Sequence, residues 1–181
     1  MPKADAIVFI DGNNLYHNLK GMQLKPGSLD FYKLSEIVCR HFGCRHKKSR
    51  YYNSVPSIEV GEEVYFKHAT FLRGIEKLPK FEVFRRKLQT CNGVVREKGI
   101  DVMIAVDMLN LSVIEKECDC CILISGDADF IPASQIIKKH EKAIFSAFIP
   151  KGYSWELRKK LDYWTLGREF LLEKCMKEPF S

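Results

Sequence analysis

Three short runs dominated by apolar residues limit the folds that this chain can adopt. They are AIVFI at 6–10, CCILIS at 120–125 and AIFSAFIP at 143–150. A strand with apolar residues on both faces must be covered on both sides, as the strands of parallel sheets are. Stretches with helical apolar spacing lie between these runs. The alternation predicts an α/β fold with three layers, α/β/α, around a central, mainly parallel sheet.

Further elements complete the alternation of strands and helices. The stretch 101–115 is apolar nearly all round, so a central, buried helix is expected there. The last predicted helix begins after Ser154, a plausible N-cap. No linker or repeat divides the chain, so we expect one domain over 1–181, with a core of about 6–166 and a short C-terminal tail. Other helices are predicted within 11–20, 29–42, 64–78 and 129–140, and other strands at 49–56 and 81–89.

Composition narrows the class of protein. The 29 Lys and Arg against 23 Asp and Glu give a formal net charge of +6, which permits a polyanionic partner without proving one. No apolar run approaches the ~20 residues that cross a bilayer, so no membrane partner is expected. The first apolar run is too short for a secretory signal. Seven cysteines without a regular framework favour free thiols in a reducing compartment. A cytoplasmic location follows as the default.

Acidic residues follow two of the predicted strands. AIVFI ends at Asp11, and CCILIS is followed by Gly126 and Asp127. Asp129 comes two residues later, and Asp101 opens the apolar helix. Ligands of an open parallel sheet gather outside the carboxyl ends of its strands, so these side chains should share one edge. Carboxylates that converge repel one another unless a cation neutralises them, and an all-oxygen set suits Mg²⁺ or Mn²⁺ rather than zinc. Such an ion can activate water for metal-assisted displacement.

Taken singly, each of these aspartates has a simpler explanation. Asp127 or Asp129 could be the N-cap of the next helix, and Asp101 could cap a helix that starts at Val102. The joint placement of Asp11 and Asp127 at two strand ends favours a metal site for the set as a whole. Within the set, Asp127 is predicted to bind the ion directly, and Asp129 to bind through water or to do the capping.

Asp107 and Asn14 are predicted to support the site. Asp107 lies about 120° around the helix and ~9 Å along it from Asp101, so the two cannot bind one ion side by side. A carboxylate inside so apolar a helix needs a partner, which makes Asp107 a supporting group behind the site or an anchor for the helix. Asn14 either fixes the turn after Asp11 or binds a phosphate or a water on the metal.

Four motifs resemble those of a known family. FIDGNNL, EKGIDVMIAVDML and LISGDADFIPA occur in this order, and the tail contains SWELRKKLDYW. Together they resemble the NYN domain, part of the PIN-like nuclease superfamily, and in particular its LabA/DUF88 branch. The resemblance implies a PIN-like, Rossmann-like α/β/α fold and a metal-dependent ribonuclease. It implies that catalysis and metal binding fall to Asp11, Asp101, Asp127 and Asp129, with Asn14 and Asp107 at further positions that match family motifs.

The leading hypothesis is therefore a Mg²⁺- or Mn²⁺-dependent endoribonuclease that hydrolyses phosphodiester bonds of single-stranded or structured RNA. Four basic residues are predicted to contact the nucleic acid backbone. The alternative is a non-catalytic RNA-binding or regulatory module that retains the acidic metal pocket. A homodimer is compatible with the sequence, but no feature fixes an interface. The four basic residues are Lys98, Arg96, Arg85 and Arg86.

A second candidate metal site lies in CRHFGCRH. It holds Cys39, His41, Cys44 and His46, residue types that bind zinc. Their spacing is tighter than that of paired zinc knuckles, and Cys39 falls on the apolar side of its predicted helix. A buried thiol is the favoured interpretation, as it is for the cysteines of CCILIS. Burial in the core is likewise favoured for Tyr51 and Tyr52 over base stacking.

Overall fold

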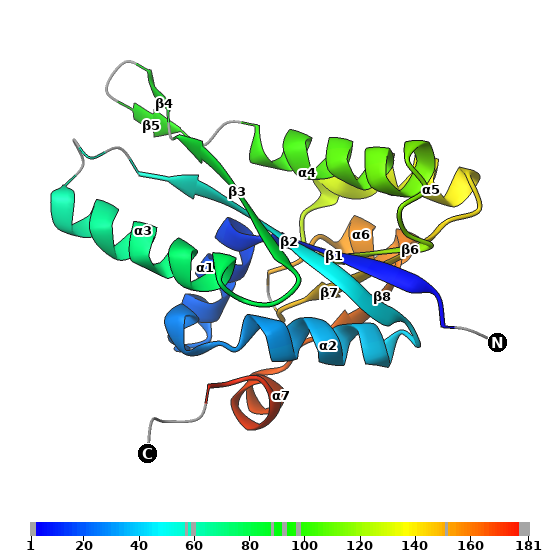
Figure 1. Ribbon diagram of the computed structural model, residues 1–181, viewed down its shortest axis with the longest axis horizontal. Coiled ribbons are helices and arrows are strands. Elements are labelled where there is room, and N and C mark those ends of the chain that lie inside the picture. Colours follow the sequence, from blue (N-terminus) through cyan, green and yellow to red (C-terminus); the bar gives the residue numbers. More distant parts are fainter. Residues whose placement is uncertain are drawn as a thin grey trace.

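The computed structural model has a six-stranded parallel sheet at its centre (Figure 1). It describes residues 3–56, 58, 61–87, 89–91, 94–96, 99–150 and 152–177, without the side chains of 87, 89–91 and 94–96. The strand order is β3-β2-β1-β6-β7-β8, and every neighbouring pair is parallel. The predicted fold class is confirmed. The strands are β1 (Asp5–Asp11), β2 (Arg45–Val55), β3 (Phe81–Lys87), β6 (Cys120–Ile124), β7 (Ala143–Phe148) and β8 (Asp162–Thr165).

Helices cover both faces of this sheet, and the side chains of β1 show why. Alternate residues point to opposite faces of a strand. Val8 and Ile10 pack in one core cluster, whereas Ile7 and Phe9 pack in another. The first cluster is completed by α1 (Gly12–Gly21), α2 (Phe31–His41), α3 (Glu62–Glu76) and α7 (Arg168–Lys174). The second is completed by α4 (Ile100–Leu109), α5 (Ile131–Lys139) and α6 (Trp155–Lys160).

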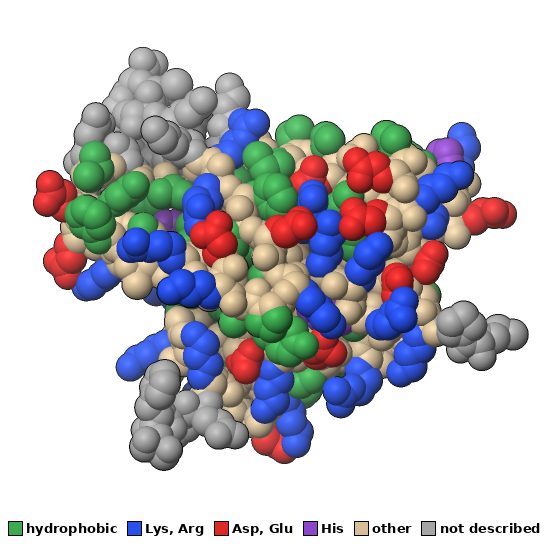
Figure 2. Space-filling model, in the orientation of Figure 1, with side chains coloured by type: hydrophobic (Ala, Val, Ile, Leu, Met, Phe, Trp, Pro, Cys, Tyr) green, Lys and Arg blue, Asp and Glu red, His purple; other side chains and the backbone are tan. Residues whose placement is uncertain are grey.

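The helix α4 is not the central, buried helix that its composition predicts. Val102 and Val106 are 66% and 56% exposed, and Ile114 in the π-helical turn η3 (Asn110–Ile114) is 72% exposed. Figure 2 shows hydrophobic side chains at the surface over α4. The helix lies in an outer layer, so only the face that carries Ile104 and Met108 meets the sheet. Uniform apolarity therefore predicted burial where the geometry allows only one buried face.

The structure also contains elements that the sequence did not predict. The last predicted helix ends at Lys160, and its continuation forms β8, the edge strand next to β7. The short helix α7 then packs on the first cluster. An antiparallel hairpin of β4 (Gln89–Cys91) and β5 (Val94–Arg96) follows β3. No helix among the described residues is long and apolar enough to span a membrane.

A polar anchor holds α4 on the sheet. Asp107 accepts hydrogen bonds from Arg50 Nη1 at 2.9 Å and from the Tyr52 hydroxyl at 2.7 Å, both on β2. Burial raises the pKa of Tyr52, so its hydroxyl stays protonated and donates. Arg50 also pairs with Glu82 on β3 at 2.8 Å. This is the anchor role that the sequence offered for Asp107 as one of two options.

Replacing this anchor should destabilise the fold. In Asp107→Ala the buried Tyr52 hydroxyl loses its acceptor, and the free energy of unfolding should fall by about 1–3 kcal/mol. Glu63→Ala, which removes an exposed ion pair with Lys67 on α3, is the control and should change stability little. Urea unfolding followed by circular dichroism measures both. Equal stability of the two variants would contradict the anchor role.

Candidate metal centre

The ends of two neighbouring strands form the base of the site. Ile10 of β1 pairs with Ile124 of β6, so both strands reach the same edge of the sheet together. The chain continues from β1 into Asp11, and from β6 through Ser125 and Gly126 into the next turn. The carboxyl ends of parallel strands are where such folds gather polar side chains.

Three carboxylates converge beside this edge. Oxygens of Asp101, Asp127 and Asp129 all lie within 4.8 Å of one another. Asp101 comes from the first turn of α4, and the other two come from the start of the 3-10 helix η4 (Ala128–Phe130). Asp101 and Asp127 are half-buried, whereas Asp129 is exposed to solvent. Like charges this close favour a bound cation, and an all-oxygen set without Cys or His fits a hard divalent ion such as Mg²⁺ or Mn²⁺.

The fourth predicted carboxylate, Asp11, is held differently. It is only 4% exposed and is not part of the close set of three. One oxygen accepts the backbone N–H of Asn14 at 3.0 Å and so caps α1, and the other accepts the Ser125 hydroxyl at 3.0 Å. The same Ser125 oxygen accepts the N–H of Asp127 at 3.3 Å. Asp11 is therefore tied through Ser125 to the turn that carries Asp127.

Capping and clustering coincide in this site. Asp127 is the N-cap of η4, because its Oδ1 accepts the N–H of Asp129 at 3.0 Å. Of the two roles predicted for Asp129, capping does not hold, since η4 begins at Ala128 and its N-cap is Asp127; binding the ion through water remains a prediction. Asp101 is not a cap either: α4 starts at Ile100, after Gly99 in the left-handed region at φ 83°. Capping occupies only one oxygen of Asp127, so it does not compete with a place in the cluster.

The turn that carries Asp127 is fixed from two sides. Asn14 Oδ1 accepts from Asn18 Nδ2 at 2.9 Å and from the Gly126 N–H at 3.4 Å. On the other side the Gly126 carbonyl accepts the Ser154 N–H at 2.7 Å. A Cβ on Gly126 would lie 1.9 Å from the Gly152 carbonyl oxygen, so only glycine fits. The Asn14 side chain thus supports the turn at Gly126 and not, as predicted, the turn after Asp11, where Asp11 itself accepts the Asn14 N–H. Its other predicted role, binding a phosphate or a water on the metal, remains a prediction.

Sequence reasoning missed two residues of this turn, Ser125 and Gly126. The signal for Gly126 was its place between a buried strand and an aspartate, where the backbone must bend. Ser125 gave no such signal, because a serine at a strand end has no distinctive pattern. Its hydrogen bond to Asp11 depends on the pairing of β1 with β6, which the sequence does not show.

Two of the four predicted nucleic-acid-binding residues can be placed. Arg86 at the end of β3 puts its Nη1 3.0 Å from where a Cβ of Gly99 would lie, two residues before Asp101. It thus reaches the start of α4, next to the acidic cluster. Arg85 is paired with Glu76 on α3 at 2.7 Å. Lys98 and the side chain of Arg96 lie outside the described residues.

The second candidate metal site is not assembled in the structure. His46 bonds to Glu36 and Ser49, each at 2.8 Å, and His41 stacks on Trp164. Within the part of the chain that the structure describes, only the three aspartates form a group that could hold a metal ion. Cys39 and Cys44 are buried thiols, and Tyr51 and Tyr52 are buried as predicted.

A solved structure of the T5 5′-exonuclease with divalent metal ions (zinc) bound is similar to this chain. The TM-score is 0.45 and the sequence identity 17%. The similarity covers 78% of this chain and 55% of that one, so the chain spans little more than half of the exonuclease. No curated protein matches this chain.

The family model named NYN domain matches residues 5–166. The match extends from β1 through β8 and contains the three clustered aspartates. It thus covers the sheet and the candidate metal centre together. The chain belongs to the NYN domain family, a family of PIN-like nucleases.

Proposed function

We propose that this protein is an endoribonuclease that hydrolyses RNA phosphodiester bonds with Mg²⁺ or Mn²⁺. The observation that carries the proposal is the convergence of Asp101, Asp127 and Asp129 at the carboxyl edge of the sheet. Membership of a nuclease family supports the reaction class. RNA as the substrate rests on the resemblance to the NYN motifs and on the positive net charge of +6.

The three clustered carboxylates would hold the ion. When bound, a divalent ion supplies water of lowered pKa and stabilises the charge that develops on the phosphate oxygens. The half-buried Asp101 and Asp127 would fix its position, while the exposed Asp129 leaves an open side toward solvent and substrate. Arg86, beside Gly99, is the described cation best placed to contact the substrate backbone near the cluster.

Asp11 has a defined place in this scheme. Its hydrogen bond from Ser125 holds the turn that presents Asp127, so it is a positioning residue for the cluster. Its role as a further metal ligand, which the sequence predicted, remains a prediction. So do the LabA/DUF88 branch, a cytoplasmic location and a homodimer. A non-catalytic RNA-binding module with the same acidic cluster is the alternative that the cleavage experiment separates.

Metal binding should depend on the cluster. We expect Mn²⁺ titration by calorimetry to show saturable binding to the wild type. Removing one ligand charge in Asp127→Asn should weaken the affinity by at least about tenfold. Glu173→Gln is the matched control, because it neutralises a carboxylate on α7 that is 68% exposed and outside the cluster. Equal Mn²⁺ affinity of Asp127→Asn and Glu173→Gln would contradict the proposed metal centre.

Cleavage should depend on the same residues. With Mn²⁺, the wild type and Glu173→Gln should cut single-stranded or structured RNA internally, as gel analysis of end-labelled substrates would show. Asp101→Asn and Asp127→Asn should lose on the order of 100-fold or more in rate, since the ion stabilises the transition state by several kcal/mol. Asp11→Asn should lose activity as well, through the displaced turn.

Cleavage that survives the changes at Asp11 and Asp127 would refute this assignment of the active site. RNA binding without turnover in Mn²⁺, at several substrate lengths, would instead favour the non-catalytic module.

A further inference from the structure

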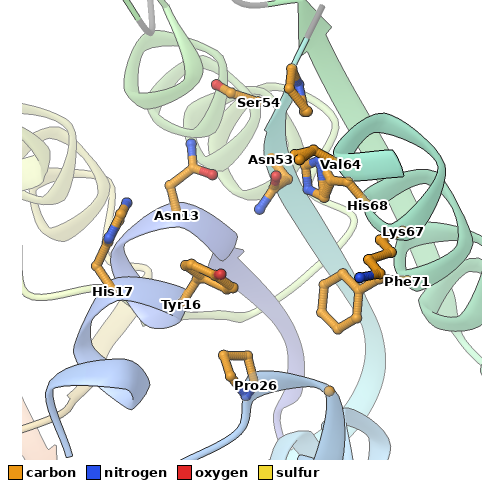
Figure 3. A pocket seen from close by; sticks show the side chains of 12 residues that line it. Asn13, Tyr16, His17, Pro26, Asn53, Ser54, Val64, Lys67, His68 and Phe71 are labelled. Carbon is orange, nitrogen blue, oxygen red and sulfur yellow. The ribbon is translucent and has the colours of Figure 1, made fainter. Parts of the chain in front are cut away.

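A pocket of about 490 Å³ opens beside the candidate metal centre, between α1 and α3 (Figure 3). Its floor includes Asn53 and Ser54, near the end of β2. Tyr52 is the β2 partner of Asp11, so Asn53 stands one residue beyond the level at which β1 ends. Asn13, two residues after Asp11, lines the rim. The pocket, at β2, and the metal centre, at β6, thus lie on either side of the end of β1 at the same carboxyl edge of the sheet.

The walls of the pocket are mainly apolar and aromatic. Tyr16 on α1 and Phe71 on α3 stand on opposite sides of the opening, and Val64, also on α3, and Pro26 add to the lining (Figure 3). Tyr16 is 39% exposed, so its ring is available to a ligand. The volume lies in the range of pockets that enclose small organic groups, roughly 300–1,000 Å³.

Two buried polar atoms in this lining have no hydrogen-bond partner among the residues that the structure describes. They are Asn53 Oδ1 and His68 Nδ1. Asn53 is only 3% exposed, and its side chain already donates to the Tyr51 hydroxyl. Burial lowers the pKa of His68, so its ring is neutral at pH 7. Buried polar groups are nearly always paired, and an orphaned acceptor in a pocket indicates a missing donor.

Gly12 connects this pocket to the acidic edge. A Cβ on Gly12 would lie 2.6 Å from both Asn53 Nδ2 and the Tyr51 hydroxyl oxygen. The backbone that follows Asp11 therefore lies directly against the side chains behind the pocket. A strand that runs along this edge from the metal centre toward β2 would come to the pocket opening.

We propose that this pocket receives one unpaired nucleobase of the bound nucleic-acid strand. The proposal rests on the proposed function, because the strand would be the one presented to the metal centre. A base is planar, stacks on aromatic rings and carries N–H donors on its edge. One such donor satisfies Asn53 Oδ1, while the ring lies against Tyr16 or Phe71.

Other ligand classes fit the pocket less well. An anionic group would find no cation within, since Lys67 is exposed and paired with Glu63 at 2.6 Å. A purely aliphatic group would leave both orphaned atoms unsatisfied. A double-stranded segment keeps its bases stacked and cannot insert one.

The test pairs abasic substitutions in RNA with changes in the pocket. Binding of a fluorescent single-stranded 8-nucleotide RNA, in EDTA so that no cleavage occurs, is measured for the wild type, His68→Ala and Tyr16→Ala. A series of RNAs lacks the base at one position each. At one position, loss of the base should weaken binding to the wild type about tenfold. The same loss should change the affinity of either variant by less than twofold.

His140→Ala provides the matched control. This histidine is exposed at the end of α5 and does not line the pocket, so the variant should respond to abasic RNA as the wild type does. Thermal unfolding checks that each variant is folded. Tyr16→Ala changes a partly exposed side chain, so it keeps the test decisive if His68→Ala does not fold.

The outcomes separate this proposal from the proposed function. If loss of a base has the same effect on the wild type and on the pocket variants, the proposal that the pocket binds a base is overturned, even if Mn²⁺-dependent cleavage is found. Base-dependent coupling without any cleavage upholds the pocket and refutes the nuclease. An absence of single-strand binding in the wild type overturns the pocket.

Discussion

The burial of β6 over its whole length, and of β1 from Ala6 to its end, is the constraint on which the rest of the molecule depends. Every residue of β6 is buried, and β1 sends its side chains into two separate cores. Burying an unpaired polar side chain is costly, so polar groups that serve a site are placed where these buried strands end. The carboxylates, the turn at Gly126 and the polar floor of the pocket all stand at that edge, so the site follows from the way in which the sheet is covered.

The sequence was informative where a local pattern had one structural solution. Apolar runs predicted the central strands, and aspartates at the ends of two of them predicted the acidic edge that Asp127 now occupies. It was uninformative where the answer depended on neighbours distant in the chain. The exposure of Val102 follows from the outer position of α4, which composition does not encode. The strand β8 resembles a continued helix until its pairing with β7 is known.

Within the site, the sequence predicted which residues take part better than it predicted the role of each one. Capping and metal binding were treated as competing explanations for Asp127, yet a carboxylate has two oxygens and capping occupies one of them. Asp11 was placed with the other aspartates because strand ends converge, but its side chain turns to Ser125 and the first turn of α1. The role of each aspartate depends on hydrogen bonds to residues far away in the sequence. The spacing of residues along the chain does not predict such bonds.

The contact at Gly12 has a mechanical consequence. Gly12 follows Asp11 directly and faces the Asn53–Tyr51 pair, and there is no room for a methyl group between its Cα and that pair. A side chain at position 12 would therefore have to displace either the Asn53–Tyr51 pair or the segment that holds Asp11, which Ser125 connects to the turn of Asp127. The pocket side and the acidic side of the edge thus meet at one residue that must be glycine.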